Sequence, residues 1–275
     1  MLTIYKIVVN NQFDQLIWKN YKKMTADKTI TGAEAVIKAL VENGVEVIFG
    51  YPGGAVLPLY DAIFDNKNIK HILVRHEQAA VHAAEGYARS TGKVGCVLVT
   101  SGPGATNAIT GLTDALMDSI PIICLSGQVP THLIGTDAFQ EADTTGISRP
   151  CTKHNYLVKN ADKLCDIIHE SFEIASTGRP GPVLIDLPKD IQLTRVQYDK
   201  KINKTKNKLI KNKSKIDQKV ITKVAELLIS AERPIIYGGG GVINAGPKAS
   251  NLLTELVDLL NSPVCLLYTS PSPRD

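Results

Sequence analysis

From Thr31 onward, apolar positions recur with helical spacing in some segments and form short strand-like runs in others. The helical pattern covers residues 32–43, 55–65, 78–91, 105–117 and 161–177. The strand pattern covers residues 45–49, 71–75, 94–100, 120–126 and 182–187. Strands that alternate with helices predict an α/β domain built on a doubly wound parallel sheet with helices on both faces.

The pattern weakens twice along the chain. Residues 127–160 show no clear period and are expected to be irregular, and the first domain is expected to close near residue 195. A second α/β unit is predicted from a helix at 217–230, a strand at 234–237, four glycines at 238–241, a helix at 249–260 and a strand beginning at Ser262. We therefore expect one complete domain followed by the start of another.

Composition narrows the class of protein. The chain has 275 residues, 44% of them apolar, and no apolar run approaches the roughly 20 residues that cross a bilayer, so no membrane span is expected. The five cysteines show no CxxC pair, which favours reduced structural thiols over a zinc or redox site. Residues 200–219 hold nine lysines and one aspartate, so this segment alone contributes +8 to a net charge of +4. A lysine run without aromatic residues favours a solvated linker, assigned to 196–216, over a nucleic-acid site.

Both ends of the chain differ from the rest. Residues 1–28 are expected to be a leader or an upstream extension, because Met24 stands just before a threonine-rich helix start. A targeting signal is the alternative, although the arginine and serine content typical of transit peptides is missing. Residues 265–275 read CLLYTSPSPRD, whose back-translation resembles a sequencing adaptor, so the native gene is expected to continue differently after Val264.

Three local motifs could carry chemistry. Glycine-rich turns at 50–54 and 101–107 each follow a strand, at the sheet edge where open α/β folds bind ligands. Glu77 opens an alanine-rich helix, where it could simply offset the helix dipole. Neither turn is a dinucleotide or phosphate-loop motif, so taken singly these features leave ligand binding and plain connection both open.

Together, however, these segments resemble the catalytic subunit of acetolactate (acetohydroxyacid) synthase, within the thiamine-diphosphate-dependent decarboxylase superfamily. The likeness runs from about Thr31 to Val264. Its markers, in chain order, are GYPGGAVLPLYDA at 50–62, HILVRHEQAAVHAAEGYAR at 71–89, VTSGPGATNAITGL at 99–112, DSIPIICLSGQVPTHLIGTDAFQEAD at 118–143, GISRPCTKHNYLV at 146–158 and TGRPGPVLIDLPKDIQ at 177–192.

The resemblance implies that residues 29–195 bind the aminopyrimidine of thiamine diphosphate, with Glu77 as the carboxylate that hydrogen-bonds its N1′ atom. It also implies roles for the residues around Glu77. Gly50, Gly54 and Ala55 would line the cofactor crevice, and Gln140 would act in catalysis. Phe139, Pro103 and Lys189 would lie near the substrate channel, although a core residue, a turn former and a surface charge are their ordinary interpretations.

The same resemblance implies FAD, bound in part by Arg149, Gly239 and Gly240, with 217–264 as the beginning of the central FAD-associated domain. No metal ligand is assigned in this chain, because the GDG motif that holds magnesium and the diphosphate in relatives does not occur in it. We therefore expect the chain by itself to be inactive.

By resemblance, pyruvate and 2-oxobutyrate are the substrates. A homodimer or homotetramer with the active site between subunits and a regulatory small subunit are the expected partners. Nucleic acid and membrane are not expected partners, and the location is cytoplasmic, with a plastid as the alternative. Another thiamine-diphosphate decarboxylase or oxidase, or a non-catalytic cofactor-binding fragment, remain the alternative functions.

Overall fold

A computed structural model describes residues 29–198 and 217–266. The chain divides into two compact units, with the boundary between residues 205 and 206, and each unit is described by itself. The expected leader, most of the lysine-rich segment and all but the first two residues of the expected adaptor-derived tail lie outside the described residues.

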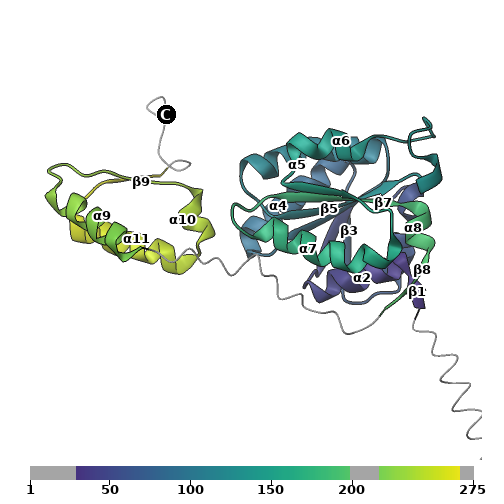
Figure 1. Cartoon of the computed structure of the whole chain (residues 1–275), viewed down its shortest axis with the longest axis horizontal. Helices are drawn as coiled ribbons and strands as arrows, with labels where there is room; N and C mark the ends of the chain where they lie inside the picture. The colour runs from purple at the N-terminus through teal and green to yellow at the C-terminus, as the bar shows by residue number, and fades with distance from the viewer. Residues whose placement is uncertain (1–28, 199–216, 267–275) are drawn as a thin grey trace, which may run out of the picture. The chain divides into compact units, whose positions relative to one another are not determined.

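The first unit is built on a six-stranded sheet in the order β3-β2-β4-β5-β7-β6, and every neighbouring pair is parallel (Figure 1). Its strands are β2 (Val47–Gly50), β3 (Lys70–Leu73), β4 (Gly95–Val99), β5 (Ile122–Gln128), β6 (His154–Leu157) and β7 (Pro182–Pro188). The parallel sheet expected from the alternating pattern is thus confirmed.

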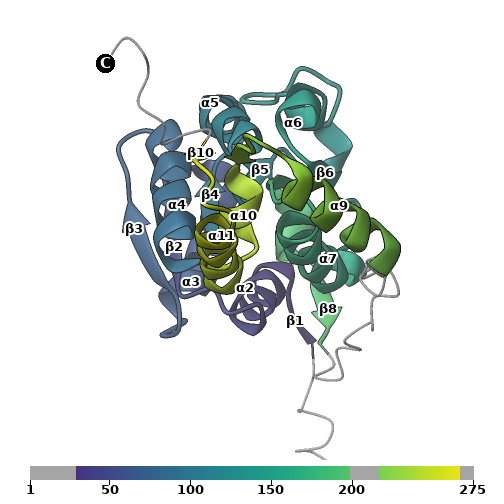
Figure 2. The same ribbon diagram turned by 90° about the vertical axis from the view of Figure 1, so that its left-hand side faces the viewer.

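Helices cover both faces of this sheet and enclose two separate cores (Figure 2). One core packs against α2 (Gly32–Glu42), α3 (Leu57–Phe64) and α7 (Leu164–Ser176), and the other against α4 (Glu77–Thr91) and α5 (Pro103–Met117). Cys96 and Leu98 of β4 face the first core, whereas Val97 and Val99 face the second, because successive side chains of a strand point to opposite faces. The sheet is therefore doubly wound, as the sequence predicted.

Local sequence signals explain several of these elements. Thr31 caps α2 through its hydroxyl, which accepts from the Glu34 backbone N–H at 3.1 Å, while the Glu34 carboxylate accepts from the Thr31 N–H at 2.7 Å. Gly92 ends α4 with φ of 71°, a left-handed conformation that glycine adopts without strain. The described cysteines form no disulfide, and Cys96 and Cys124 are fully buried, which agrees with structural thiols.

The expectation that residues 127–160 are irregular needs correction. This stretch contains β6 and the short helix α6 (Thr144–Ser148), together with the 3-10 turns η2 (Thr131–Leu133) and η3 (Arg149–Cys151). A two-stranded antiparallel sheet that the sequence pattern did not predict joins β1 (Thr29–Thr31) to β8 (Arg195–Gln197). These strands have three or four residues and polar members, which is too short for a period to emerge. Pairing with distant segments decides them.

The short elements that remain in the first unit are η1 (Gly54–Val56), η4 (Ala161–Lys163) and α8 (Lys189–Leu193). The helix expected at 55–65 is in fact divided between η1 and α3, and Pro58 stands in the first turn of α3. A proline is tolerated there because the first helical N–H groups have no partner within the helix.

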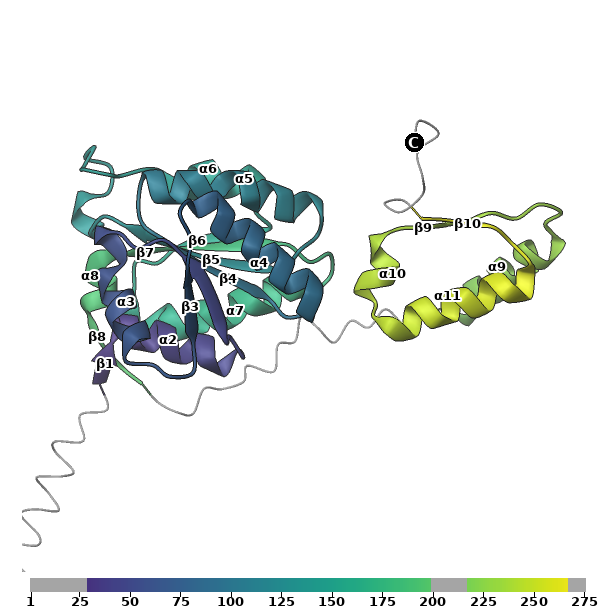
Figure 3. The ribbon, with the colours of Figure 1, turned by 180° about the vertical axis from the view of Figure 1, so that it is seen from behind.

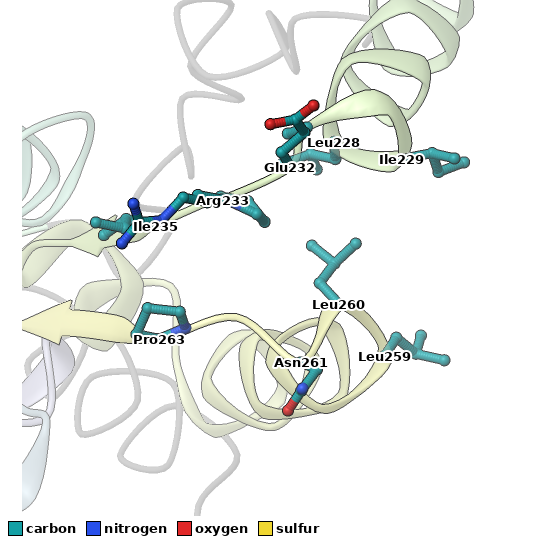
Figure 4. A pocket seen from close by; sticks show the side chains of 11 residues that line it. Leu228, Ile229, Glu232, Arg233, Ile235, Leu259, Leu260, Asn261 and Pro263 are labelled. Atoms are coloured by element: carbon teal, nitrogen blue, oxygen red, sulfur yellow. The ribbon is translucent and has the colours of Figure 1, made fainter.

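The second unit contains α9 (Gln218–Ser230), β9 (Ile236–Gly238), α10 (Gly240–Asn244), α11 (Pro247–Leu260) and β10 (Val264–Leu266), and β9 pairs with β10 in parallel (Figure 3). Its helices leave large apolar side chains exposed, among them Ile229 at 80% and Leu259 at 84%. A hollow of about 660 Å³ opens between the ends of α9 and α11, with Leu228, Ile235 and Leu260 on its walls (Figure 4). Within the described residues, none of the helices is long and apolar enough to cross a membrane.

Candidate functional site: a buried glutamate between two glycine turns

Two glycine turns meet at the carboxyl edge of the sheet, around Thr100. The first turn follows β2, and a Cβ added at Gly53 would lie 2.5 Å from Thr100 side-chain atoms. The second turn opens α5, and a Cβ at Gly104 would lie 2.7 Å from the Thr100 methyl group. Only glycine permits this approach from both sides. The Thr100 hydroxyl is buried and has no hydrogen-bond partner among the described residues.

Glu77 lies beside these turns as the first residue of α4. It is only 7% exposed, and its Oε2 accepts a hydrogen bond of 3.0 Å from the Asn107 side-chain amide on α5. Oε1 accepts no hydrogen bond from the described part of the chain, and a Cβ at Gly104 would come within 3.5 Å of it. One carboxylate oxygen is therefore held by a hydrogen bond, while the other accepts none from the described residues and lies near the backbone of Gly104.

The loop that carries Phe139 and Gln140 rests on the second glycine turn. A Cβ at Gly102 would lie 2.6 Å from the Gln140 carbonyl oxygen, and Gly102 has φ of 56° and ψ of −116°. The backbone of Gln140 also has a left-handed conformation, with φ of 58°. Phe139 is 88% exposed, so it does not occupy the core position that was its ordinary interpretation.

The Glu141 carboxylate braces the same loop by accepting from the backbone N–H groups of Gly135 and Ala138. These two hydrogen bonds favour the ionised form and lower the pKa of Glu141. The loop thus approaches Gly102 in a defined conformation, and Gln140 is exposed beside the turn that opens α5, the helix that carries Asn107.

Gly50, Gly54 and Ala55 lie at or just after the carboxyl end of β2, but in different settings. Gly50 is buried as the last residue of β2, and a Cβ there would meet the Leu98 carbonyl oxygen at 2.4 Å. Gly54 has open space around it, and the Ala55 carbonyl accepts from the Gln192 amide at 2.8 Å. Gly50 therefore serves the packing of β2 on β4, whereas Gly54 leaves room at the surface.

Pro103 and Lys189 each begin a helix at this edge, Pro103 exposed on α5 and Lys189 half-buried on α8. Arg149 begins η3 and is exposed. Gly239 and Gly240 belong to the second unit, where Gly239 caps α10. The structure thus brings Glu77, Pro103 and Gln140 into one neighbourhood and leaves Gly239 and Gly240 in a separate unit.

A buried carboxyl group that the sequence analysis did not single out lies on β7. Asp186 is 1% exposed and accepts hydrogen bonds of 2.9 Å from the Ser126 hydroxyl and from the Gln128 amide. The Gln128 amide also donates to the Ala142 carbonyl at 2.9 Å, which links this pair to the loop of Gln140. Burial raises the pKa of Asp186 to about 7, against the smaller lowering effect of the two hydrogen bonds.

Asp186→Asn is expected to change how stability depends on pH. Because the folded pKa lies above the unfolded value, the native state binds more protons, and the free energy of unfolding falls as pH rises from about 4 to about 7. Asparagine keeps both hydrogen bonds if Ser126 accepts instead of donating. The variant should match the wild-type chain at pH 4 and exceed it by about 2 to 4 kcal/mol at pH 8.

Urea denaturation of the 275-residue chain across this pH range measures the effect. The control is Asp65→Asn, which neutralises an exposed aspartate and should leave the pH profile unchanged. A wild-type profile that stays flat between pH 4 and pH 7 would contradict the elevated pKa of Asp186.

A cluster on α4 and α5 was also not anticipated. The His82 Nδ1 atom lies 3.0 Å from Glu85 Oε2 and 3.5 Å from Asp114 Oδ2. Burial of Glu85 raises its pKa, and the nearby imidazole partly offsets this effect. These three side chains have the donor types and spacing of a cation site, although such surface groups often occur without one.

Asn107, Thr100, Gln128 and Asp186 are thus the site residues that sequence reasoning missed. Asp186 carried a usable signal, because it is the one charged residue in the apolar strand 182–187. Asn107 carried none, since an asparagine one turn into a helix is unremarkable until its partner is known.

Comparison with known proteins agrees with this geometry. The family model of the thiamine pyrophosphate enzyme N-terminal TPP binding domain matches residues 30–147, which include both glycine turns and Glu77. The fold and the site therefore define the N-terminal domain of a thiamine pyrophosphate enzyme.

Individual relatives that match most of the chain identify the family within this class of enzyme. The acetolactate synthase large subunits of Haemophilus influenzae and Escherichia coli (isozyme 3) are 52% and 50% identical over 238 and 236 residues, which are 86% of this chain and 41% of each relative. The probable acetolactate synthase large subunit of Methanococcus aeolicus is 53% identical over 238 residues, 86% of this chain and 39% of the relative. The chain belongs to the acetolactate synthase large-subunit family, and it spans about two fifths of the length of the relatives it matches.

Proposed function

We propose that this chain is part of an acetolactate synthase catalytic subunit, in which residues 29–195 bind the aminopyrimidine of thiamine diphosphate. The complete enzyme would decarboxylate pyruvate and join the remaining two-carbon unit to a second pyruvate, or to 2-oxobutyrate. The products would feed the synthesis of valine, leucine and isoleucine. The observation that carries this proposal is the buried Glu77 carboxylate, with one oxygen held by Asn107 and the other without a hydrogen-bond partner among the described residues.

The residues around Glu77 fit an aminopyrimidine ring. Oε1 is an unused acceptor that suits a protonated ring nitrogen, and the glycine at position 104 places no side chain against that oxygen. When bound, thiamine diphosphate supplies the carbon nucleophile that attacks the ketone of a 2-oxo acid. The part of Glu77 would be to hold a proton at the N1′ atom of the pyrimidine, in a site that burial keeps dry.

The substrate side of the site would lie between the Gln140 loop and the first turns of α5 and α8. Gln140 offers both a donor and acceptors, and the exposed ring of Phe139 could cover a small substrate. The Lys189 ammonium group suits the carboxylate of a 2-oxo acid, and Pro103 shapes the wall beside Gly102. These roles rest on the resemblance and on the position of the loop.

FAD and magnesium belong to the proposal by resemblance. Residues 217–264 would begin a central FAD-associated domain, and the apolar side chains exposed on α9 and α11 suit elements that pack against further protein. Arg149 is exposed and Gly239 and Gly240 have open space around them, so all three could contact a flavin. Residues 196–216 would link the two domains. Magnesium and the diphosphate would be held by a part of the enzyme outside this sequence.

The relatives are named large subunits, so we extend the proposal to a regulatory small-subunit partner. A homodimer or homotetramer would complete the site, because the cofactor that meets Glu77 must be held from outside the described domain. We also propose a cytoplasmic location, which the bacterial relatives support, with a plastid as the alternative.

The test is to recover the complete native gene and assay its product for acetolactate formation from pyruvate. Activity should require thiamine diphosphate and magnesium, and omission of either should reduce the rate to background. Omission of FAD should also lower activity, since its proposed role is to support the fold of the central domain. Binding of thiamine diphosphate without acetolactate formation would instead indicate a different 2-oxo acid substrate.

A further inference from the structure

The Asn107 side chain donates a hydrogen bond to Glu77. Its Nδ2 atom lies 3.0 Å from Glu77 Oε2 across the contact between α4 and α5. A carboxylate can only accept, so the amide must present its NH₂ group and not its oxygen to Glu77. The two residues are 30 positions apart in the sequence, and the contact therefore exists only because α4 and α5 pack together.

The two carboxylate oxygens of Glu77 have different neighbours on α5. Asn107 donates to Oε2, while Gly104, three residues earlier and so on the same helical face, places no side chain near Oε1. A lone carboxylate on a flexible side chain would rotate among several conformers. With Oε2 held by Asn107, the orientation of the carboxylate is restricted, and Oε1 stays available as an acceptor.

We propose that Asn107 is a positioning residue that orients the Glu77 carboxylate so that Oε1 meets the cofactor. This inference rests on the proposed role of Glu77. Asn107 does not touch the substrate in this proposal and acts only through Glu77. Its loss should impair proton transfer at the cofactor and leave pyruvate binding intact.

Two variants of the complete enzyme test the inference. The rate at which deuterium replaces the thiazolium C2 proton of bound thiamine diphosphate reports on Glu77 without any substrate. Asn107→Ala should lower this rate and kcat together by about 10- to 100-fold, because a small misplacement of a reacting group has effects of this size. The KM for pyruvate should stay within about twofold of wild type, since uniform substrate binding is unaffected.

Asn107→Asp gives the sharper outcome. It preserves the shape of the side chain, but its ionised carboxylate cannot donate and repels Glu77. Relative to the wild type at the same pH, the exchange rate should therefore be lowest at high pH and should recover as the pH falls, because a protonated aspartate donates the hydrogen bond again. A purely structural role for Asn107 would give no such recovery.

The control is Thr113→Val on the same helix, which removes a 2.8 Å hydrogen bond to the Ile109 carbonyl and should change stability only. Other titratable or charged groups lie on α5 and on the elements packed around it, among them His76, His82, Glu85, Asp114, Arg149 and Asp186. All variants share these groups, so their titration does not account for a difference between two variants at the same pH.

The outcomes separate the inference from the proposed function. Exchange that is unchanged in Asn107→Ala, or a loss in Asn107→Asp that does not recover at low pH, would overturn the role of Asn107. A wild-type enzyme that exchanges the proton but makes no acetolactate would refute the substrate assignment alone, and the Asn107 variants would still give an answer. A wild-type enzyme that binds the cofactor without exchange would refute the role of Glu77 and with it that of Asn107.

Discussion

Glu77→Gln in the complete enzyme is expected to lower the rate of acetolactate formation by about 10²- to 10⁴-fold. Glutamine keeps the size of the side chain and can still accept from Asn107, so the fold should survive. It carries no negative charge, however, and cannot hold a proton at the pyrimidine nitrogen in the way a carboxylate can. The loss should appear in kcat, with little change in the KM for pyruvate.

Glu85→Gln is a matched control for this experiment. Glu85 lies on the same helix two turns further along and is 6% exposed, close to the 7% of Glu77. Its neighbours are His82 and Asp114 and not the glycine turns. Glu85→Gln should retain most of the activity, and a Glu77→Gln enzyme that also did so would refute the proposed role.

Gly102→Ala is expected to be the most damaging small substitution at the site. The new methyl group would lie 2.6 Å from the Gln140 carbonyl oxygen, which is backbone and cannot swing away. The backbone at position 102 is also one that only glycine adopts easily, with φ of 56° and ψ of −116°. Strain and overpacking together should cost about 2 to 4 kcal/mol of folding free energy. Displacement of the Gln140 loop should lower activity as well.

Gly92→Ala separates the two contributions to this effect. Gly92 also has a positive φ, 71°, but an added Cβ there would meet nothing within 4 Å. It should therefore cost only about 1 kcal/mol, from backbone strain alone. Urea denaturation of the 275-residue chain compares the two variants. Equal costs would mean that the contact with the Gln140 loop contributes little.

The candidate site shows where sequence reasoning reached its limit. Motifs that are continuous in the chain, namely the two glycine turns and the start of α4, could be read directly, because each follows a strand whose end fixes its place at the sheet edge. The contacts between these motifs could not be read. The hydrogen bond from Asn107 to Glu77 and the approach of Gly102 to Gln140 join residues 30 and 38 positions apart.

The sequence by itself determined the alternation of strands and helices, the two faces of the sheet and the capping of α2, since these depend on periodicity and on neighbours within four residues. The tertiary structure alone decided that β6 joins the sheet, that β1 pairs with β8, and that one oxygen of Glu77 is held while the other is left open. The physical reason is the same in each case. A hydrogen bond or a close packing contact between distant segments depends on their positions in space, which no local pattern encodes.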